Sequence, residues 1–220
     1  MLKPMHLSGP TLAIFAKQPL PGRVKTRLCP PLTAQQAAEL YEVSLRETLL
    51  RFDATDLTLV LCYCGQQQWF AAQFPDIPLL LQTGRDLGQR LASATDALFN
   101  AGASPLLIIG SDSPDLPLAL VDQALADLHQ SDLVTIPSGD GGYVLVGMRR
   151  ATPEIFNEIP WSSSQVLAAT RLQAGRRNLS YRETASWSDL DEVDDLTQLL
   201  RRSPQSRTAR HIRNHLGQHF

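Results

Sequence analysis

Short apolar runs alternate with stretches of helical periodicity as far as residue 136. Each apolar run is only four to six residues long, which is typical of a buried strand. Because strands separated by helices lie parallel, the pattern predicts a mostly parallel α/β sheet. The apolar runs are residues 11–16, 57–62, 79–82, 106–109 and 133–136; the helical stretches are a segment that follows Thr33 and residues 67–74, 87–100 and 118–129.

The first of these helices has a clear start signal. Thr33 and Gln36 have the spacing of a capping box, and the apolar residues that follow recur on one helical face. We therefore expect a crossover helix between the first two strands.

The alternation changes after Pro137. A glycine-rich turn, GDGG, leads directly into the apolar run 143–148 with no helix between them, which favours an antiparallel strand. A helix over residues 163–174, a strand over 179–183, a helix over 192–202 and a basic helical tail at about 203–220 complete the predicted order.

Composition narrows the class of protein. With 220 residues, 43% of them hydrophobic, the chain can bury a full core, and we expect a single domain over residues 1–220. The formal net charge of -2 gives no reason to expect nucleic acid as a partner. No apolar run approaches the roughly 20 residues of a membrane span, and the first ten residues do not resemble a signal peptide, so we expect a cytoplasmic protein. The sequence leaves a homodimer open.

Parallel sheets bind ligands beyond the carboxyl ends of their strands, and the loop after the first strand is strongly basic. Its sequence, FAKQPLPGRVKTRL (residues 15–28), is stiffened by two prolines, and Gly22 permits close backbone approach. Cations with a nearby hydroxyl suit phosphoryl oxygens, so we expect a polyphosphate here, against the alternative of a solvated basic loop. The spacing is not that of a Walker A motif. The predicted phosphate-binding residues are Lys17, Gly22, Arg23, Lys25, Thr26 and Arg27.

A second segment, IIGSDSPDLP (residues 108–117), places acids after another strand. A carboxylate at a strand's carboxyl end suits a hard divalent cation that also binds substrate phosphates, and Asp112 is the first choice of ligand. For Asp115 a structural role at the start of the next helix is favoured.

The late acidic cluster WSDLDEVDDL (residues 187–196) offers a second metal ligand. Glu192 and the acids after it fit the first turn of a helix and need no other function. Asp189 and Asp191 precede the helix, and either would complete a two-carboxylate magnesium site with Asp112.

Two glycine-containing turns have open alternatives. In SGDGGYVLVGM (residues 138–148), Asp140 fits a tight turn as well as it fits a sugar or acceptor contact that the glycines allow. In GRDLGQR, the residues Gly84, Gly88 and Arg90 suit a nucleotide base or ribose, and a plain helix start explains the segment equally well.

The tail carries several arginines and His211, His215 and His219 at four-residue spacing. A charged surface helix is the favoured interpretation, with a metal on the histidines the lesser one.

Taken together, these segments resemble a bacterial family of transferases with the GT-A, nucleotide-diphospho-sugar transferase fold, associated by name with radical-SAM/selenodomain systems and arsenosugar biosynthesis. The resemblance is more distant to the molybdenum-cofactor and deazaflavin-cofactor nucleotidyltransferases. It covers nearly the whole chain through six ordered blocks: FAKQPLPGRVKTRL, GRDLGQR, IIGSDSPDLP, DGGYVLVG, IPWSSSQV and DLDEVDDL.

The resemblance implies a Rossmann-like, three-layer αβα fold with a mostly parallel mixed sheet. It implies that Mg²⁺ or Mn²⁺ binds Asp112 and Asp191, that Lys25 and Asp112 are catalytic, and that the basic loop holds nucleotide phosphates. The side facing the sugar or an unknown small-molecule acceptor would include Asp140, Gly141, Gly142, Tyr143 and Trp161.

Two reactions share such a scaffold. In glycosyl transfer, the acceptor attacks the anomeric carbon of a nucleotide sugar, and the nucleoside diphosphate leaves. In nucleotidyl transfer, the acceptor attacks the α-phosphorus of a nucleoside triphosphate, and pyrophosphate leaves. Four loop cations favour a triphosphate, whereas the resemblance favours the nucleotide sugar, which we prefer. A non-catalytic nucleotide-binding protein and an α/β-hydrolase are the weaker alternatives, because both acids are present and no G-x-S-x-G motif occurs.

Overall fold

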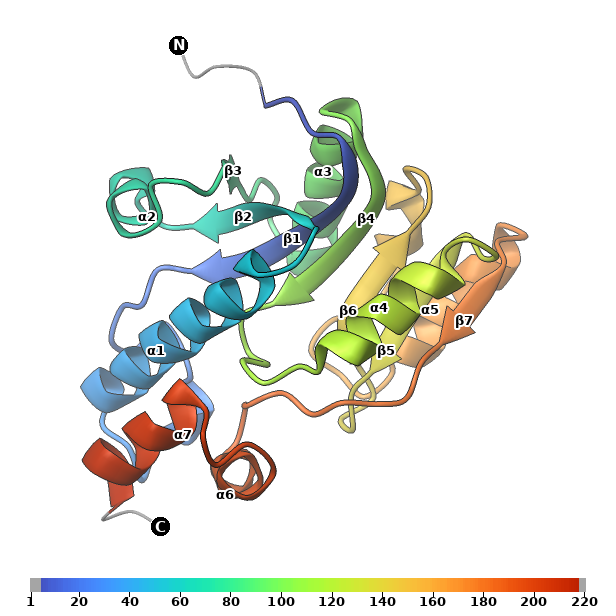
Figure 1. Ribbon diagram of the computed structural model, residues 1–220. Helices are drawn as coiled ribbons and strands as arrows, with labels where there is room; N and C mark the ends of the chain where they lie inside the picture. Colours follow the sequence, from blue (N-terminus) through green and yellow to red (C-terminus); the bar gives the residue numbers. More distant parts are fainter. Residues whose placement is uncertain (1–4, 218–220) are drawn as a thin grey trace.

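A seven-stranded mixed sheet forms the centre of the computed structural model, which describes residues 5–217 (Figure 1). The strand order is β3-β2-β1-β4-β6-β5-β7, and β6 alone among them runs antiparallel to its neighbours. The strands are β1 (Gly9–Lys17), β2 (Thr58–Cys64), β3 (Leu79–Leu81), β4 (Ala103–Gly110), β5 (Leu133–Pro137), β6 (Tyr143–Met148) and β7 (Tyr181–Glu183).

The helices connect the strands much as the sequence pattern predicts. Helix α1 starts with the predicted capping box, in which Thr33 accepts a hydrogen bond from the backbone N–H of Gln36. The α-helices are α1 (Ala34–Asp53), α2 (Gln67–Gln73), α3 (Leu87–Asn100), α4 (Leu118–Asp127), α5 (Val166–Arg176), α6 (Val193–Arg202) and α7 (Arg207–His211). Shorter helical turns are η1 (Thr26–Leu28), η2 (Pro153–Phe156) and η3 (Ile212–Leu216).

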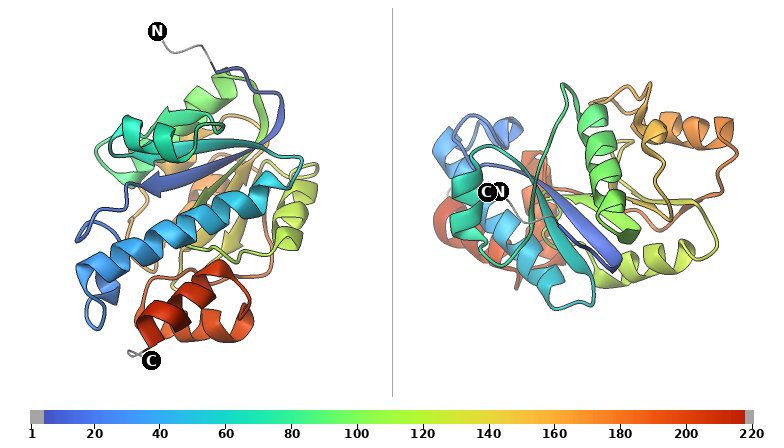
Figure 2. Two further views of the ribbon diagram at one scale, coloured as in Figure 1. Left: turned by 60° about the vertical axis from the view of Figure 1, so that its left-hand side comes forward. Right: turned by 90° about the horizontal axis from the view of Figure 1, so that it is seen from above.

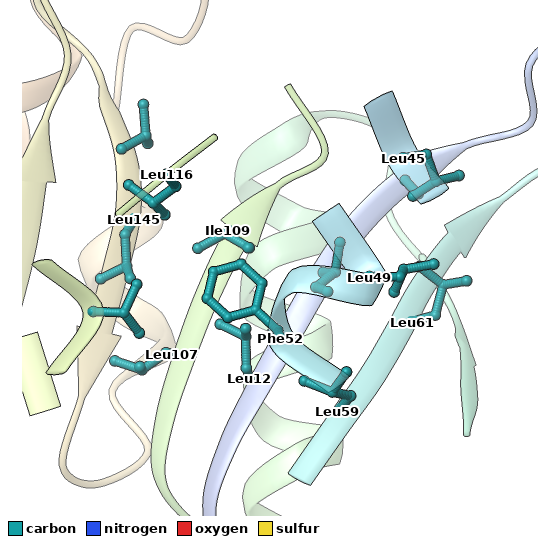
Figure 3. Packing of buried hydrophobic residues seen from close by; sticks show 14 of the residues in the cluster. Leu12, Leu45, Leu49, Phe52, Leu59, Leu61, Leu107, Ile109, Leu116 and Leu145 are labelled. Carbon is teal, nitrogen blue, oxygen red and sulfur yellow. The ribbon is translucent and has the colours of Figure 1, made fainter. Parts of the chain in front are cut away.

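Two hydrophobic clusters on opposite faces of the sheet give the three layers. Leucines of α1 pack on side chains of β1, β2 and β4 (Figure 3). Residues of α2 and α4 belong to the same cluster. The other face is covered by α3 and by α5. Successive residues of β1 alternate between the clusters: Leu12 and Ile14 face α1, whereas Ala13 faces α3. The predicted Rossmann-like αβα architecture is confirmed.

A third cluster joins α6 and η3 to the start of α1, and the left view of Figure 2 shows the C-terminal helices below the sheet, beside α1. The buried carboxylate of Glu47 on α1 accepts hydrogen bonds from the backbone N–H groups of Arg207 and Thr208, each at 2.8 Å. Within the predicted basic tail, residues 207–216 are therefore helical and docked. His219 lies outside the described residues, and no group of three or more potential metal ligands is found within residues 5–217.

The strand Tyr143–Met148 pairs antiparallel with both β4 and β5, as predicted from the turn that precedes it. No helix within the described part of the chain has the length and apolar character to cross a membrane.

Asp132, the residue before β5, links this strand to residues next to the ends of β6 and β7. Its carboxylate accepts hydrogen bonds from the backbone N–H and hydroxyl of Ser180, at 3.0 and 2.7 Å, and from Arg149 at 2.8 Å. The Ser180 hydroxyl and the Arg149 guanidinium lower the pKa of Asp132 to about 2.

We expect Asp132→Asn to lower the free energy of unfolding at pH 7 by about 1–2 kcal/mol, because hydrogen bonds to an ionised group are lost. A lowered pKa in the folded state means that this stabilisation is complete above about pH 4 and disappears as the pH falls towards 2. The difference between the two proteins in urea denaturation should therefore shrink below pH 4. The exposed Asp122→Asn is the control, and a difference that is the same at pH 3 and pH 7 would contradict the assignment.

Candidate active site

A cavity of about 750 Å³ lies where β1 and β4 end. Its walls come from the loop after β1, the start of α3, the segment after β4, the turn before β6 and the segment before α6. The predicted site residues that line it are Lys17, Arg23, Lys25, Thr26, Arg27, Arg90, Asp112, Asp140, Gly142, Tyr143, Trp161 and Asp191.

Lys25 connects three segments that are far apart in the sequence. Its ammonium group forms an ion pair with Asp112 and donates to the carbonyl oxygen of Leu190, while the Leu190 N–H donates to the carbonyl oxygen of Asp112 at 2.8 Å. Only 4% of the Lys25 side chain is exposed, against 44% of that of Asp112. The basic loop, the end of β4 and the late acidic segment therefore meet at one place.

A second ion pair joins Arg27 to Asp191 at the surface of the cavity, with both side chains substantially exposed. Within residues 5–217, neither Lys17 nor Arg23 has an ion-pair partner. Two of the four loop cations are thus balanced by acids in the free protein.

Asp189 faces the same group of charges. Burial, followed by the neighbouring charge of Asp112, raises the pKa of Asp189 to about 6, although Lys25 opposes the shift. Both acids that the sequence offers as partners for Asp112 therefore line the cavity, with Asp191 held by Arg27 and Asp189 beside Asp112.

Tyr41 is a site residue that the sequence pattern does not reveal. Its hydroxyl accepts a hydrogen bond from the backbone N–H of Lys17 at 2.9 Å and bonds to the Ser111 hydroxyl at 2.7 Å. Burial raises the pKa of Tyr41, so the phenol stays neutral and fixes the end of β1 against the residue before Asp112. Its place on the apolar face of α1 predicts only a core residue.

The turn before β6 is the tight turn that Asp-Gly favours. The Asp140 carboxylate accepts hydrogen bonds from the Gly142 N–H, at 3.0 Å, and from the Ser138 hydroxyl. Gly141 has φ of 88°, and a Cβ there would lie 2.2 Å from the carbonyl oxygen of Ser164. A glycine at this position lets the turn pack against the serine run, and Asp140 and Gly142 remain at the cavity wall.

The segment Gly84–Arg90 is a regular helix start. Asp86 caps α3 by accepting from the Gln89 N–H at 2.8 Å, and Arg90 donates to the Gly84 carbonyl at 3.1 Å. The space beside Gly88 is taken by the Trp161 indole, 2.5 Å from the position of a Cβ. Gly22, Gly84, Gly88 and Gly141 are not among the lining residues, so their predicted ligand contacts stay predictions.

Asp115 has the structural role favoured from the sequence, with a different partner. Its buried carboxylate binds Arg202 of α6 through two hydrogen bonds of 2.7 and 3.0 Å, whereas Pro117 is the N-cap of α4. Arg202 also donates to the Ser188 carbonyl at 2.9 Å, which anchors the acidic segment that lines the cavity.

The carboxylates suit a divalent cation that shares its coordination with a substrate. Within residues 5–217 no cluster of three or more protein ligands could enclose a metal. Magnesium is commonly held by one or two carboxylates together with substrate phosphates, and Asp112 with Asp191 or Asp189 fits that mode.

Residues 45–163 match a protein family described as "Uncharacterized protein conserved in bacteria (DUF2064)". The chain belongs to this family. The DUF2064 chain is 31% identical to a "putative nucleotide-diphospho-sugar transferase" from Desulfovibrio desulfuricans G20, whose crystal structure superposes with a TM-score of 0.89 over 97% of this chain and 99% of the other. No curated protein matches the DUF2064 chain in sequence.

More distant structures share its fold. The synthetase of CMP-2-keto-3-deoxy-manno-octonic acid, solved with CTP, has 11% identity and a TM-score of 0.54 over 90% of this chain and 99% of the other. Rv0371c from Mycobacterium tuberculosis H37Rv, solved with manganese, has 18% identity and a TM-score of 0.50 over 89% of this chain and 100% of the other. The nucleotide-diphospho-sugar transferase type of fold, expected from the sequence resemblance, is confirmed.

Asp189→Asn should stabilise the free protein at neutral pH. A raised pKa in the folded state means that ionising Asp189 costs stability; the cost is absent below about pH 4 and complete above about pH 6. The free energy of unfolding of the variant, measured by chemical denaturation, should exceed that of the wild-type protein by up to about 2 kcal/mol at pH 8 and should equal it near pH 4. Asp191→Asn, which removes an exposed pair, should change stability little at either pH. An equal gain for Asp189→Asn at both pH values would rule out this account.

Proposed function

We propose that this protein is a metal-dependent transferase that uses a nucleotide-activated sugar as its donor. The observation that carries the proposal is the meeting of Lys25, Asp112 and the Asp189–Asp191 segment at one cavity beyond the carboxyl ends of parallel strands. Relatedness to a putative nucleotide-diphospho-sugar transferase, and the fold shared with the CMP-2-keto-3-deoxy-manno-octonic acid synthetase that was solved with CTP, support a nucleotide-utilising transferase.

Charge balance supports a metal-bound diphosphate. Five cationic side chains and four carboxylates line the cavity, so five minus four leaves about one net positive charge. Such a cavity cannot neutralise a nucleotide's phosphates alone, and a bound Mg²⁺ or Mn²⁺ would supply the remaining positive charge for the departing diphosphate. The cations are Lys17, Arg23, Lys25, Arg27 and Arg90; the acids are Asp112, Asp140, Asp189 and Asp191.

The loop cations change partners when a metal binds. In the free protein Lys25 and Arg27 are paired with acids, so Lys17 and Arg23 are the loop cations open to phosphate oxygens. When Asp112 and Asp191 bind the metal, Lys25 and Arg27 become available to the phosphates as well. The preference for a nucleotide sugar over a nucleoside triphosphate therefore rests on the relative and not on the number of cations.

The other end of the cavity suits an acceptor. Asp140, Gly142 and Tyr143 line it beside Trp161 and the serine run that follows. The Asp140 carboxylate, held in its turn through one oxygen, has a second oxygen that can accept a hydroxyl proton from the sugar or acceptor.

Nucleotidyl transfer is the alternative. It is supported by the CTP complex of a structure with the same fold and by Arg90, which adds a fifth cation to the four of the loop. In that reaction the same residues would hold a nucleoside triphosphate while an acceptor displaces pyrophosphate. The link to the radical-SAM/selenodomain and arsenosugar transferases likewise stays part of this proposal.

Thermal-shift measurements with nucleotide sugars and nucleoside triphosphates, each with and without Mg²⁺, test the proposal. A nucleotide sugar at 100 times its Kd should stabilise the protein by about 2.7 kcal/mol, and only when the metal is present. Asp112→Asn should lose the metal dependence while remaining folded. Stabilisation by triphosphates alone would favour nucleotidyl transfer, and no response to any nucleotide would end the proposal.

Lys25→Met should separate phosphate binding from metal binding. Removing the ammonium frees Asp112, so affinity for Mn²⁺ alone should be kept or increased, whereas nucleotide affinity should fall by about tenfold or more. Calorimetric titration of each ligand measures the two effects. Arg201→Met, which removes an exposed cation outside the cavity, is the control. Equal losses of metal and nucleotide affinity would indicate a structural defect instead.

A further inference from the structure

Gln82 lines the cavity and lies immediately after β3, where the sequence pattern gives no sign of a function. Its backbone N–H donates to the Tyr63 carbonyl at 2.9 Å and continues the pairing with β2. Its side-chain Nε2 donates to two further backbone carbonyls, that of Cys62 at 2.8 Å and that of Ala16 at 3.2 Å.

These contacts fix the orientation of the amide. Both partners are carbonyl oxygens, which cannot donate, so the Gln82 side chain cannot be turned over without losing both bonds. Both N–H groups are used, and Oε1 has no hydrogen-bond partner within residues 5–217. The amide therefore presents a rigid acceptor, and a ligand that meets it must bring an N–H or O–H group.

The neighbouring wall suits a flat heteroaromatic ring. Leu87, Arg90 and Leu91 lie on one face of the first turns of α3 and line the cavity, and 45% of Leu87 is exposed. Arg90 donates to the Gly84 carbonyl and to the Cys64 sulfur and has no carboxylate partner within the described residues. An apolar wall thus adjoins a fixed acceptor and a guanidinium donor.

The position relative to Asp112 fits a nucleotide. Gln82 and Arg90 both contact the end of β2, at Cys62 and Cys64, and β1 alone separates β2 from β4 in the sheet. Because the Gln82 amide also contacts Ala16 of β1, it lies between one and two strand spacings, about 5–10 Å, from β4, whose end leads to Asp112. A base at Gln82 would leave its phosphates near Lys25.

We propose that Gln82 selects the nucleobase, by accepting a hydrogen bond from an N–H group on the edge of a ring that packs on Leu87. The inference rests on the proposed use of a nucleotide. The site takes a base that presents an N–H donor to Gln82 next to an acceptor for Arg90, and discrimination among bases depends on how well that donor meets the fixed oxygen.

A double-mutant cycle between protein and ligand tests the contact. The probes are CDP, UDP, ADP and GDP with Mg²⁺, an analogue of the tightest binder with its base N–H replaced by C–H, its 2′-deoxy form, and pyrophosphate. The variants are Gln82→Met, which removes the acceptor, and Gln82→Lys, which removes it but keeps donors for both backbone carbonyls.

In the wild-type protein, the analogue should bind about tenfold or more weakly than the natural nucleotide. In both variants the natural nucleotide and the analogue should differ by less than about twofold, while pyrophosphate affinity stays within about twofold of wild type. Pyrophosphate binding also serves as the control for folding of the site.

Each other outcome has a definite meaning. A wild-type protein that does not distinguish the analogue overturns the assignment without any variant. The assignment is also overturned if the analogue binds more weakly than the natural nucleotide by the same factor in the wild type and in both variants. It is likewise overturned if the Gln82 substitutions change the effect of removing the 2′-hydroxyl, because that result would place the ribose at Gln82. Binding of nucleotides with any of these results removes only the role of Gln82, whereas absence of all nucleotide binding removes the proposed function as well.

Discussion

The cavity depends on the burial of one charge. The Lys25 ammonium is almost completely shielded from water, and a buried cation needs both a counter-charge and hydrogen-bond acceptors. Asp112 supplies the first and the Leu190 carbonyl contributes to the second. Because these partners belong to the end of β4 and to the segment before α6, pairing one side chain sets the positions of three walls at once. The same pairing also stabilises the left-handed backbone conformation of Lys25, whose φ is 48°.

The fold follows from the sequence because its signals are local. Short apolar runs, a capping box and an Asp-Gly turn each act within a few residues, and together they specify strands, crossover helices and the antiparallel β6. Element ends are less predictable from the sequence. Strand β4 begins at Ala103, three residues before its apolar run, because pairing of Ala103 with Gly9 of β1 extends it across Ser104 and Pro105. The turn η1 has no apolar periodicity and depends on contacts made by Lys25.

The sequence predicts where the candidate site lies, but not which of its side chains contact one another. Charged residues after parallel strands meet at one edge of the sheet, which explains why Lys25, Asp112 and Asp191 line one cavity. Which cation pairs with which acid depends on side-chain packing, and no spacing encodes it. The same limit applies to Tyr41 and Gln82, since an apolar helix face and a strand end look alike whether or not they line a ligand site.

The hydrogen bond between Lys25 and Leu190 joins residues that are 165 positions apart in the sequence. The cavity is therefore completed late in the synthesis of the chain. During synthesis β1, β2 and β4 can pair well before residue 190 leaves the ribosome, and contacts of such high sequence separation form slowly. Until then the Lys25 ammonium has no acceptor at Leu190 and the acidic wall is missing. A nascent chain would thus contain the sheet and the basic loop without the complete cavity. The cavity is complete only after the segment before α6 has been synthesised.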